Sequence, residues 1–97
     1  MPNRLPAIHP GEALRDEMEA LELSANALAA ALDVPTNRIT MILKGQRAIT
    51  ADTALCLARY LGTSAQFWLN LQQSFDLKQA ETTAGATIRR KVKPRAA

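Results

Sequence analysis

The sequence predicts an all-α domain of five helices that ends in a basic tail. Apolar residues recur at helical spacing along residues 10–79, and no stretch shows the apolar–polar alternation of a half-buried strand. Proline, glycine and hydroxyl residues stand where such helices would begin and end. The 97 residues, 47% of them hydrophobic, are enough for one domain with one core.

The first predicted helix covers about residues 10–21, with Pro10 at a first helical position. His9 precedes it and is expected to cap it, with Glu12 reaching back as in a capping box. We favour this structural role over a catalytic one, because His9 is the only histidine and no Ser, Cys or carboxylate pair has a catalytic context. The stripe expected to face the core consists of Leu14, Met18 and Leu21.

Two short helices are predicted next. Ser24 is the expected N-cap of a helix over about residues 25–32, because its hydroxyl can accept from the free amides of the first turn. A third helix begins near Pro35 and stops at Gly45. The connection at residues 33–34 is short enough for a helix-turn-helix, in which the second helix lies in the DNA major groove. The predicted contact between the two helices consists of Leu28 and Ala29 against Val34, Ile39 and Ile42.

The last two helices are bounded by similar signals. Thr50 is the expected N-cap of the fourth helix, and Gly62 is its expected stop. Ser64 is the expected N-cap of a fifth helix over about residues 65–78. The chain therefore contains five helices with short connections.

Charge divides the chain into two parts. Residues 1–79 carry seven cations and eight acids, whereas residues 80–97 carry five cations and one acid, so the net charge of +3 comes from the C-terminal segment. That segment has little apolar content and no helical period, which predicts a flexible tail, 80–97, behind a single domain, 1–79. The tail could bind phosphates, contact an acidic helix of a second copy, or add only to solubility.

Several classes of protein are not expected. The lone Cys56 cannot form an intrachain disulfide and is expected to be a small buried hydrophobe. The sequence predicts no metal site and no cofactor, because no Cys/His cluster has metal-ligand spacing. No apolar run approaches the ~18 residues of a membrane span, and no signal-peptide pattern opens the chain, so we expect a cytoplasmic protein. We expect no enzyme, because the chain lacks a plausible catalytic constellation.

The third helix carries the functional signal. Its apolar residues Ile39, Ile42 and Leu43 form one buried stripe when each residue turns the helix by about 100°. The face turned away from them collects hydroxyls, an amide and a cation, and residues 34–51 contain no acid. Such side chains can bond base edges or neutralise phosphates. The alternative, a solvated helix in an ordinary bundle, would not explain the missing acids.

We therefore predict a DNA interface on this face. Base readout is assigned to Thr36, Asn37, Thr40 and Met41. Phosphate contacts are assigned to Ser24, Arg38, Lys44 and Arg47.

The fifth helix predicts a dimer. Four of its apolar residues follow spacings of three and four, while Leu69 and Leu77 point elsewhere. A helix that is apolar on more than one side leaves surface that a five-helix monomer cannot cover. Two recognition helices about one helical turn apart, roughly 34 Å, would then require a palindromic operator. The predicted dimer contacts are Phe67, Trp68, Leu71 and Phe75.

Three stretches of the chain resemble one family closely. "HPGE", "RAITADTALCLARYLGTS" and "FWLNLQ" together resemble the HigA-type antitoxins, a branch of the XRE/Cro-like helix-turn-helix superfamily. The resemblance covers about residues 8–79. It implies a lambda-repressor-like DNA-binding domain that dimerises and binds its own promoter. It also implies a toxin partner, usually an mRNA-cleaving ribonuclease of RelE-like fold.

The acidic first helix suits such a partner. Its acids are most often a solvated face, but a ribonuclease that grips RNA must be basic, and complementary charge would steer it to this surface. The candidate toxin-binding residues are Asp16, Glu17, Glu19 and Glu22.

Two other functions stay open. The chain could be a free-standing repressor without a toxin, which keeps the DNA site. It could also be a helical protein-interaction module that has lost DNA binding, since Ala25 stands where many superfamily members have a Gln that buttresses a phosphate contact.

Overall fold

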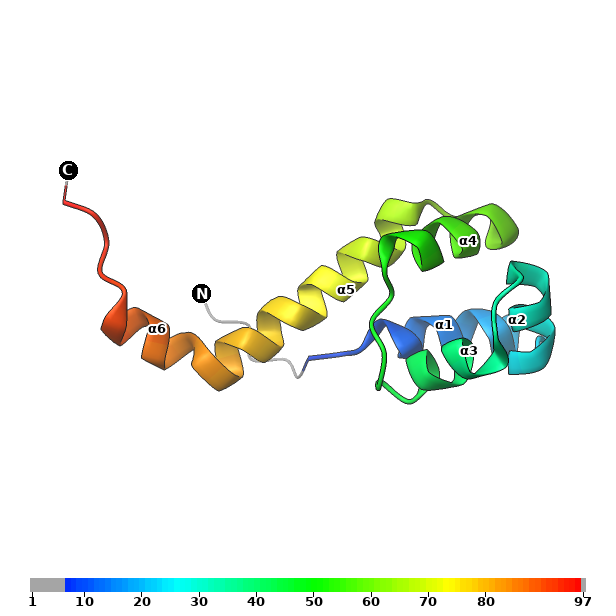
Figure 1. The fold of residues 1–97 in the computed structure, drawn as a ribbon, viewed down its shortest axis with the longest axis horizontal. Coiled ribbons are helices and arrows are strands. Elements are labelled where there is room, and N and C mark those ends of the chain that lie inside the picture. Colours follow the sequence, from blue (N-terminus) through cyan, green and yellow to red (C-terminus); the bar gives the residue numbers. More distant parts are fainter. Residues whose placement is uncertain (1–6, 97) are drawn as a thin grey trace.

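The computed structural model describes residues 7–96 and is helical along most of that length. The five predicted helices are present, and they are followed by a π-helical turn and a short sixth helix (Figure 1). Their bounds are α1 Pro10–Ala20, α2 Ala25–Leu32, α3 Thr36–Leu43, α4 Ala51–Leu61, α5 Ala65–Ala80, η1 Glu81–Gly85 and α6 Ala86–Lys91. Within the described residues no helix is long and apolar enough to cross a membrane.

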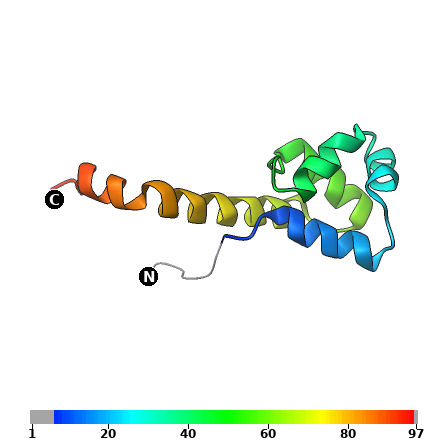
Figure 2. The same cartoon turned by 90° about the horizontal axis from the view of Figure 1, so that it is seen from below.

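The molecule has a packed body and a protruding arm. Helices α1 to α4 and α5 as far as Asp76 form the body, in which α2 packs on α3, α1 on α3, and α4 on α5. From there α5 runs outward and continues through η1 into α6, as Figures 1 and 2 both show. The described chain therefore extends 53 Å in one direction but only 24 and 22 Å in the others. We call residues 7–76 the body and residues 77–91 the arm.

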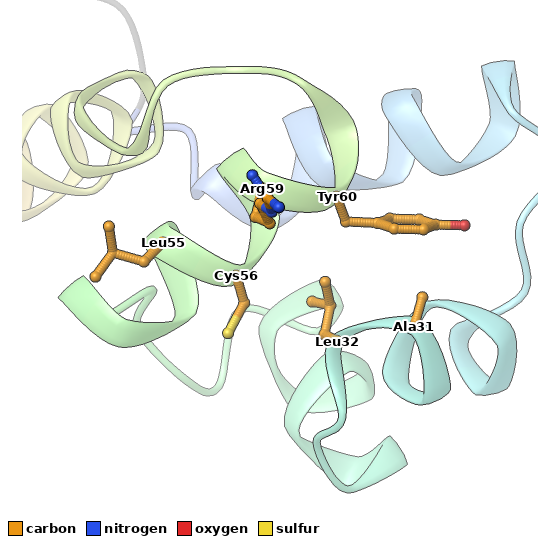
Figure 3. Close-up of a pocket in the computed structure, with 6 residues that line it drawn as sticks. All are labelled: Ala31, Leu32, Leu55, Cys56, Arg59 and Tyr60. Atoms are coloured by element: carbon orange, nitrogen blue, oxygen red, sulfur yellow. The ribbon is translucent and has the colours of Figure 1, made fainter.

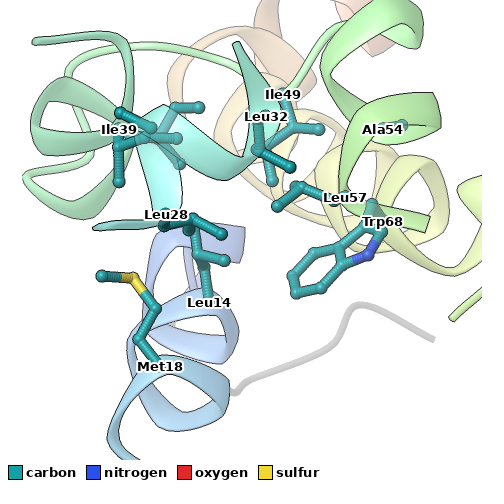
Figure 4. Close-up of a cluster of buried hydrophobic side chains, with 11 residues drawn as sticks. Leu14, Met18, Leu28, Leu32, Ile39, Ile49, Ala54, Leu57 and Trp68 are labelled. Carbon is teal, nitrogen blue, oxygen red and sulfur yellow. The ribbon is translucent and has the colours of Figure 1, made fainter. Parts of the chain in front are cut away.

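One hydrophobic core lies inside the body (Figure 4). Trp68 is its largest side chain and is fully buried, and its indole Nε1 donates to the Thr63 hydroxyl at 2.8 Å. The small Ala29 is 1% exposed where α2 packs on α3, in the contact that the sequence predicted. The other core residues are Leu14, Met18, Leu28, Leu32, Ile39, Ile42, Ile49, Ala54 and Leu57.

Three predicted helix caps are confirmed. The Nδ1 atom of His9 accepts a hydrogen bond from the Gly11 amide at 3.0 Å at the start of α1, but the Glu12 side chain makes no return bond in the described structure. The hydroxyls of Ser24 and Ser64 accept amides of the first turns of α2 and α5, each at 3.0 Å. Thr50 holds the N-cap position of α4, but its hydroxyl bonds the Asp52 carboxylate instead of a backbone amide.

The turn between α2 and α3 requires a left-handed residue. Asp33 adopts it, with φ 57° and ψ 48°, and short polar side chains such as Asp tolerate this conformation better than most. Its amide donates to the Ala30 carbonyl at 3.2 Å, and the Val34 amide donates to the Ala29 carbonyl at 3.0 Å. The turn thereby satisfies the last carbonyls of α2 and directs the chain straight into α3.

The structure corrects two expectations about local order. The chain does not lose regular structure after Glu81, because the helix continues to Lys91. An established helix end extends more easily than a new helix starts, since the nucleating turn is the costly step. Leu21 does not lie on the buried stripe of α1: it is the C-cap residue, beyond the last helical turn, and is 52% exposed.

Candidate nucleic-acid interface

The outward face of α3 has the orientation that the sequence predicted. Ile39 and Ile42 are fully buried and hold the helix against α1 and α2. On the other side Asn37 is exposed, while Thr36, Thr40 and Met41 are half-buried. The Thr40 hydroxyl donates to the backbone carbonyl of Asn37 at 3.2 Å. The Asn37 side chain takes no part in this bond and is exposed, so its amide group can meet a base edge.

Two of the predicted phosphate contacts are open cations. Lys44 follows the last turn of α3 and Arg47 lies in the loop behind it, and both are exposed. Ser24 is also exposed, but its oxygen already accepts the Ala27 amide, so only the hydroxyl hydrogen remains to donate to a phosphate. The structure thus places the two cations beside the end of α3. Ser24 caps α2 in addition to its predicted phosphate contact.

Arg38 is held within the protein. Its Nη1 atom lies 3.7 Å from the Asp52 carboxylate at the start of α4, and its side chain is only 26% exposed. Among the described residues, its Nε is a buried nitrogen without a hydrogen-bond partner. The Thr50 hydroxyl, more than Arg38, lowers the pKa of Asp52, so the carboxylate is charged and ready to hold the guanidinium. A phosphate contact would have to compete with this ion pair.

The first turn of α1 supports the end of α3, which the sequence did not reveal. A Cβ atom on Gly11 would overlap the carbonyl oxygen of Ile42, so only glycine allows α1 to approach α3 this closely. Arg15 adds a long hydrogen bond from Nη2 to the Leu43 carbonyl, at 3.4 Å. A glycine directly after Pro10 was the available signal, but nothing in the sequence showed what it faces.

A buried amide supports the loop after α3, and no sequence pattern indicated it. Gln72 on α5 is 7% exposed, and its Oε1 accepts from the Ile49 amide at 2.8 Å. Its Nε2 donates to Asp76 Oδ1 at 3.0 Å. A single Gln in an amphipathic helix is usually a surface residue, so its burial had to come from the structure.

The predicted dimer residues of α5 have four different surroundings. Phe67 is 42% exposed and meets the Trp68 ring edge-on, with centroids 5.0 Å apart. Trp68 is fully buried in the core, so the prediction that it contacts a second copy is wrong. Leu71 is half-buried, and Phe75 packs edge-on against His9. Further along, Leu77 is 69% exposed.

The acidic residues of the first helix are accessible. Asp16 and Glu19 are exposed on α1, Glu22 is exposed just beyond it, and Glu17 is half-buried. None of the four belongs to an ion pair in the part of the chain that the structure describes. The surface could therefore take up a basic partner without first breaking internal contacts.

An apolar groove lies between α2 and α4 (Figure 3). Leu55 is 64% exposed and Tyr60 is 48% exposed there, and Cys56 is half-buried at its wall, less covered than the sequence suggested. The groove is lined by Ala31, Leu32, Leu55, Cys56, Arg59 and Tyr60.

Comparison with known proteins places this geometry in a family. Residues 14–68 match the helix-turn-helix family, a span that contains α2, α3 and α4 entirely. Virulence-associated protein I of Dichelobacter nodosus is 59% identical over 80 residues, which are 81% of this chain and 74% of that protein.

Solved structures agree over almost the full length. An addiction module antidote protein of the HigA family from Coxiella burnetii is 51% identical, with a TM-score of 0.91, and the match covers 94% of this chain and 100% of that one. The Pseudomonas aeruginosa antitoxin HigA, solved with the higBA promoter, is 44% identical with a TM-score of 0.89, over 93% of this chain and 99% of that one. Because these matches cover 94% and 93% of this chain, they include most of the arm as well as the body.

Proposed function

The chain belongs to the helix-turn-helix family and, within it, to the HigA antitoxins, and from this premise we propose that it represses its own operon and neutralises a toxin. In this proposal a dimer binds a palindromic operator through α3. The partner is a basic, RelE-like, mRNA-cleaving toxin. The observation that carries the DNA-binding part is the acid-free outward face of α3 and the loop behind it.

Each residue of this face has a proposed role. Thr36, Asn37, Thr40 and Met41 read base edges, with Asn37 the strongest candidate because its exposed amide can bond adenine at two points. Lys44 and Arg47 neutralise phosphates, since both are exposed and neither is paired with an acid in the described structure. Ser24 and Arg38 contribute less, because each is already engaged within the chain.

The matched variants Asn37→Ala and Lys44→Ala test these roles. Asn37→Ala should lose about 1–3 kcal/mol of discrimination at one base pair of the operator. Lys44→Ala should weaken operator and unrelated DNA alike and lower the salt slope by about one unit per protomer. Mobility-shift titrations on operator variants at several salt concentrations measure both. An Asn37→Ala protein with unchanged base preference would contradict the assignment.

The dimer is proposed to form through the apolar surface of α5. Among the predicted contacts Phe67 supports it most, because it leaves a large apolar area exposed, and Leu71 and Phe75 offer less. Leu77 was not among the predicted contacts, but it adds a second large exposed apolar side chain on α5. A two-fold dimer of this kind presents two copies of α3 to successive major grooves. Sedimentation of the wild type and of Phe67→Ser/Leu77→Ser tests it, and an unchanged mass for the double variant would exclude this surface.

The toxin is proposed to dock on the acidic residues of the first helix, Asp16, Glu17, Glu19 and Glu22. Exposed acids without internal partners would steer and hold a basic ribonuclease. Co-purification with the product of an adjacent gene tests the partnership. Replacing Asp16, Glu19 and Glu22 by their amides should weaken capture while DNA binding persists.

Two alternatives make different predictions in the same experiments. A free-standing repressor would bind the operator but retain no product of a neighbouring gene. A protein-interaction module would retain a partner and fail to shift the upstream DNA at any salt concentration. Antitoxin function requires both results together.

A further inference from the structure

The loop after α3, residues 44–50, is held by contacts at both ends and is exposed to solvent between them. At its start the amides of Gly45 and Gln46 donate to carbonyls in the last turns of α3, at 3.0 and 2.9 Å. At its end the Ile49 side chain is 2% exposed and lies in the core. Arg47, between these points, is exposed. The position of its charge therefore depends on how firmly the two ends are held.

Gln72 holds the far end. Its Oε1 accepts the Ile49 amide at 2.8 Å, and this bond is buried. Its Nε2 donates to Asp76 at 3.0 Å, so the amide can turn only its oxygen towards the loop. A buried amide that loses its only partner is costly, so the loop cannot move away from α5 without a penalty.

His9 holds the near end from the opposite side. Its ring packs edge-on against Phe75 of α5, with centroids 4.9 Å apart. Gly45, with φ 73°, turns the chain beside His9, where an added Cβ would be in ordinary van der Waals contact with the ring, at 3.8 Å. The loop is thus seated between the start of α1 and the middle of α5.

We propose that Gln72 is a positioning residue for DNA binding. It touches no DNA itself, but it fixes the loop that carries Arg47 and follows Lys44, so that both cations meet the phosphates without a further loss of loop freedom. The inference rests on the proposed DNA binding through α3. In this proposal Gln72 affects only the affinity for the DNA phosphates, through Lys44 and Arg47. Base readout stays with α3, because Ile39 and Ile42 hold that helix in place independently of Gln72.

Gln72→Leu tests the proposal, with Gln73→Leu as the matched control because Gln73 is exposed on the same helix. The salt dependence of binding is measured on the operator and on an unrelated duplex. Gln72→Leu should reduce the slope by about one to two units per protomer, since roughly one unit is lost with each phosphate contact. Both duplexes should weaken by the same factor, and Gln73→Leu should match the wild type.

A swap restores the same bonds with reversed partners. In Gln72→Glu/Asp76→Asn, the carboxylate introduced on α5 can still accept the Ile49 amide. The side-chain amide introduced one turn later can donate to that carboxylate, and the net charge does not change. This variant should regain the wild-type slope. A role in stability alone would change the fraction of folded protein but leave the slope of every variant unaltered.

The possible results distinguish failure of the Gln72 positioning role from failure of the proposed DNA binding. If the wild type binds no DNA, the proposed function fails. If it binds and Gln72→Leu keeps the wild-type slope, or the swap fails to restore it, only the positioning role is overturned. Should Gln72→Leu not fold, amide exchange of the wild type decides: strong protection of the Ile49 amide supports the anchor, and exchange as fast as an exposed loop amide overturns it.

Discussion

The body and the arm are both helical, but they are held by different interactions. Every buried apolar side chain of the described core belongs to the body. The arm exposes its large apolar residues: Leu77 is 69% exposed and Ile88 is 51% exposed. Val92, which directly follows the arm, is 65% exposed. Its contacts are mainly between consecutive elements, η1 with α5 and α6 with η1. The helices of the body are therefore stabilised by packing between distant residues, and the arm by contacts between neighbouring ones.

A local clamp supports the π-helical turn of the arm. Arg89 Nη1 lies 3.0 Å from Glu81 Oε2, eight residues away, and the pair passes over Gly85. A Cβ atom on Gly85 would overlap the Glu81 carboxylate, so the glycine makes room for the pair. The Thr83 hydroxyl adds a bond to the Gln79 carbonyl at 2.9 Å. None of these contacts reaches the body.

The comparison is tested most strongly by one truncation made in each region. Ile39→Ala should lower the free energy of unfolding by about 2–5 kcal/mol, because it leaves a cavity in a packed core. Ile88→Ala should change it by less than about 0.5 kcal/mol, as expected of a surface position. Urea unfolding at two protein concentrations measures both. A large, concentration-dependent loss for Ile88→Ala would show that a second copy covers the arm.

The same substitution at two helical glycines should have opposite results. Gly11→Ala forces a Cβ against the backbone of Ile42, which cannot give way, and should cost about 1–3 kcal/mol of stability. Gly85→Ala meets only the ends of the flexible Glu81 and Arg89 side chains, which can shift, and should favour the helix by up to about 1 kcal/mol. Thermal unfolding reports the first change and circular dichroism the second. Equal losses would mean that the arm is packed like the body.

Acid should weaken the body through His9. Burial lowers the pKa of His9 from its ordinary 6.5. Asp76, the Arg47 backbone and Glu12 raise this pKa, but by less than burial lowers it. The Nδ1 atom must also stay unprotonated to cap α1. The unfolded chain therefore binds the proton more readily. The stability from this site is complete above about pH 6.5 and is lost as pH falls through the lower folded pKa.

Denaturant unfolding between pH 7.5 and 5 measures this loss. His9→Asn keeps a capping side chain but cannot titrate, and the chain has no other histidine, so its stability should vary less over this range. If the two proteins lose stability equally on acidification, His9 is not the cause.

The smallest effect is expected from the clamp of the arm. The side chains of Glu81 and Arg89 are 62% and 68% exposed, so solvent and salt screen their attraction. Glu81→Gln should cost roughly 0.2–1 kcal/mol of local helix stability at low salt, and less at high salt. Helicity by circular dichroism and amide exchange in the arm measure it. Arg89→Gln added to Glu81→Gln should have little further effect, and an additive loss would argue against a direct pair.

Sequence patterns predicted the five helices because their signals are local. Ser24 and Ser64 cap the helices that follow them, and Ile39 and Ile42 turn the polar face of α3 outward, all within a few consecutive residues. The arm was missed because a composition poor in apolar residues indicates that no core will form, which is correct. It does not indicate whether an existing helix will end.

What the sequence determined by itself is where the five predicted helices begin and which face of α3 is free of acids, since capping and periodicity are properties of neighbouring residues. Only the tertiary structure decided which residues meet from distant helices. It placed Trp68 in the core, Gly11 against the end of α3, and Gln72 beneath the loop that carries Arg47. Such contacts depend on how whole helices cross, and no short stretch of sequence contains that information.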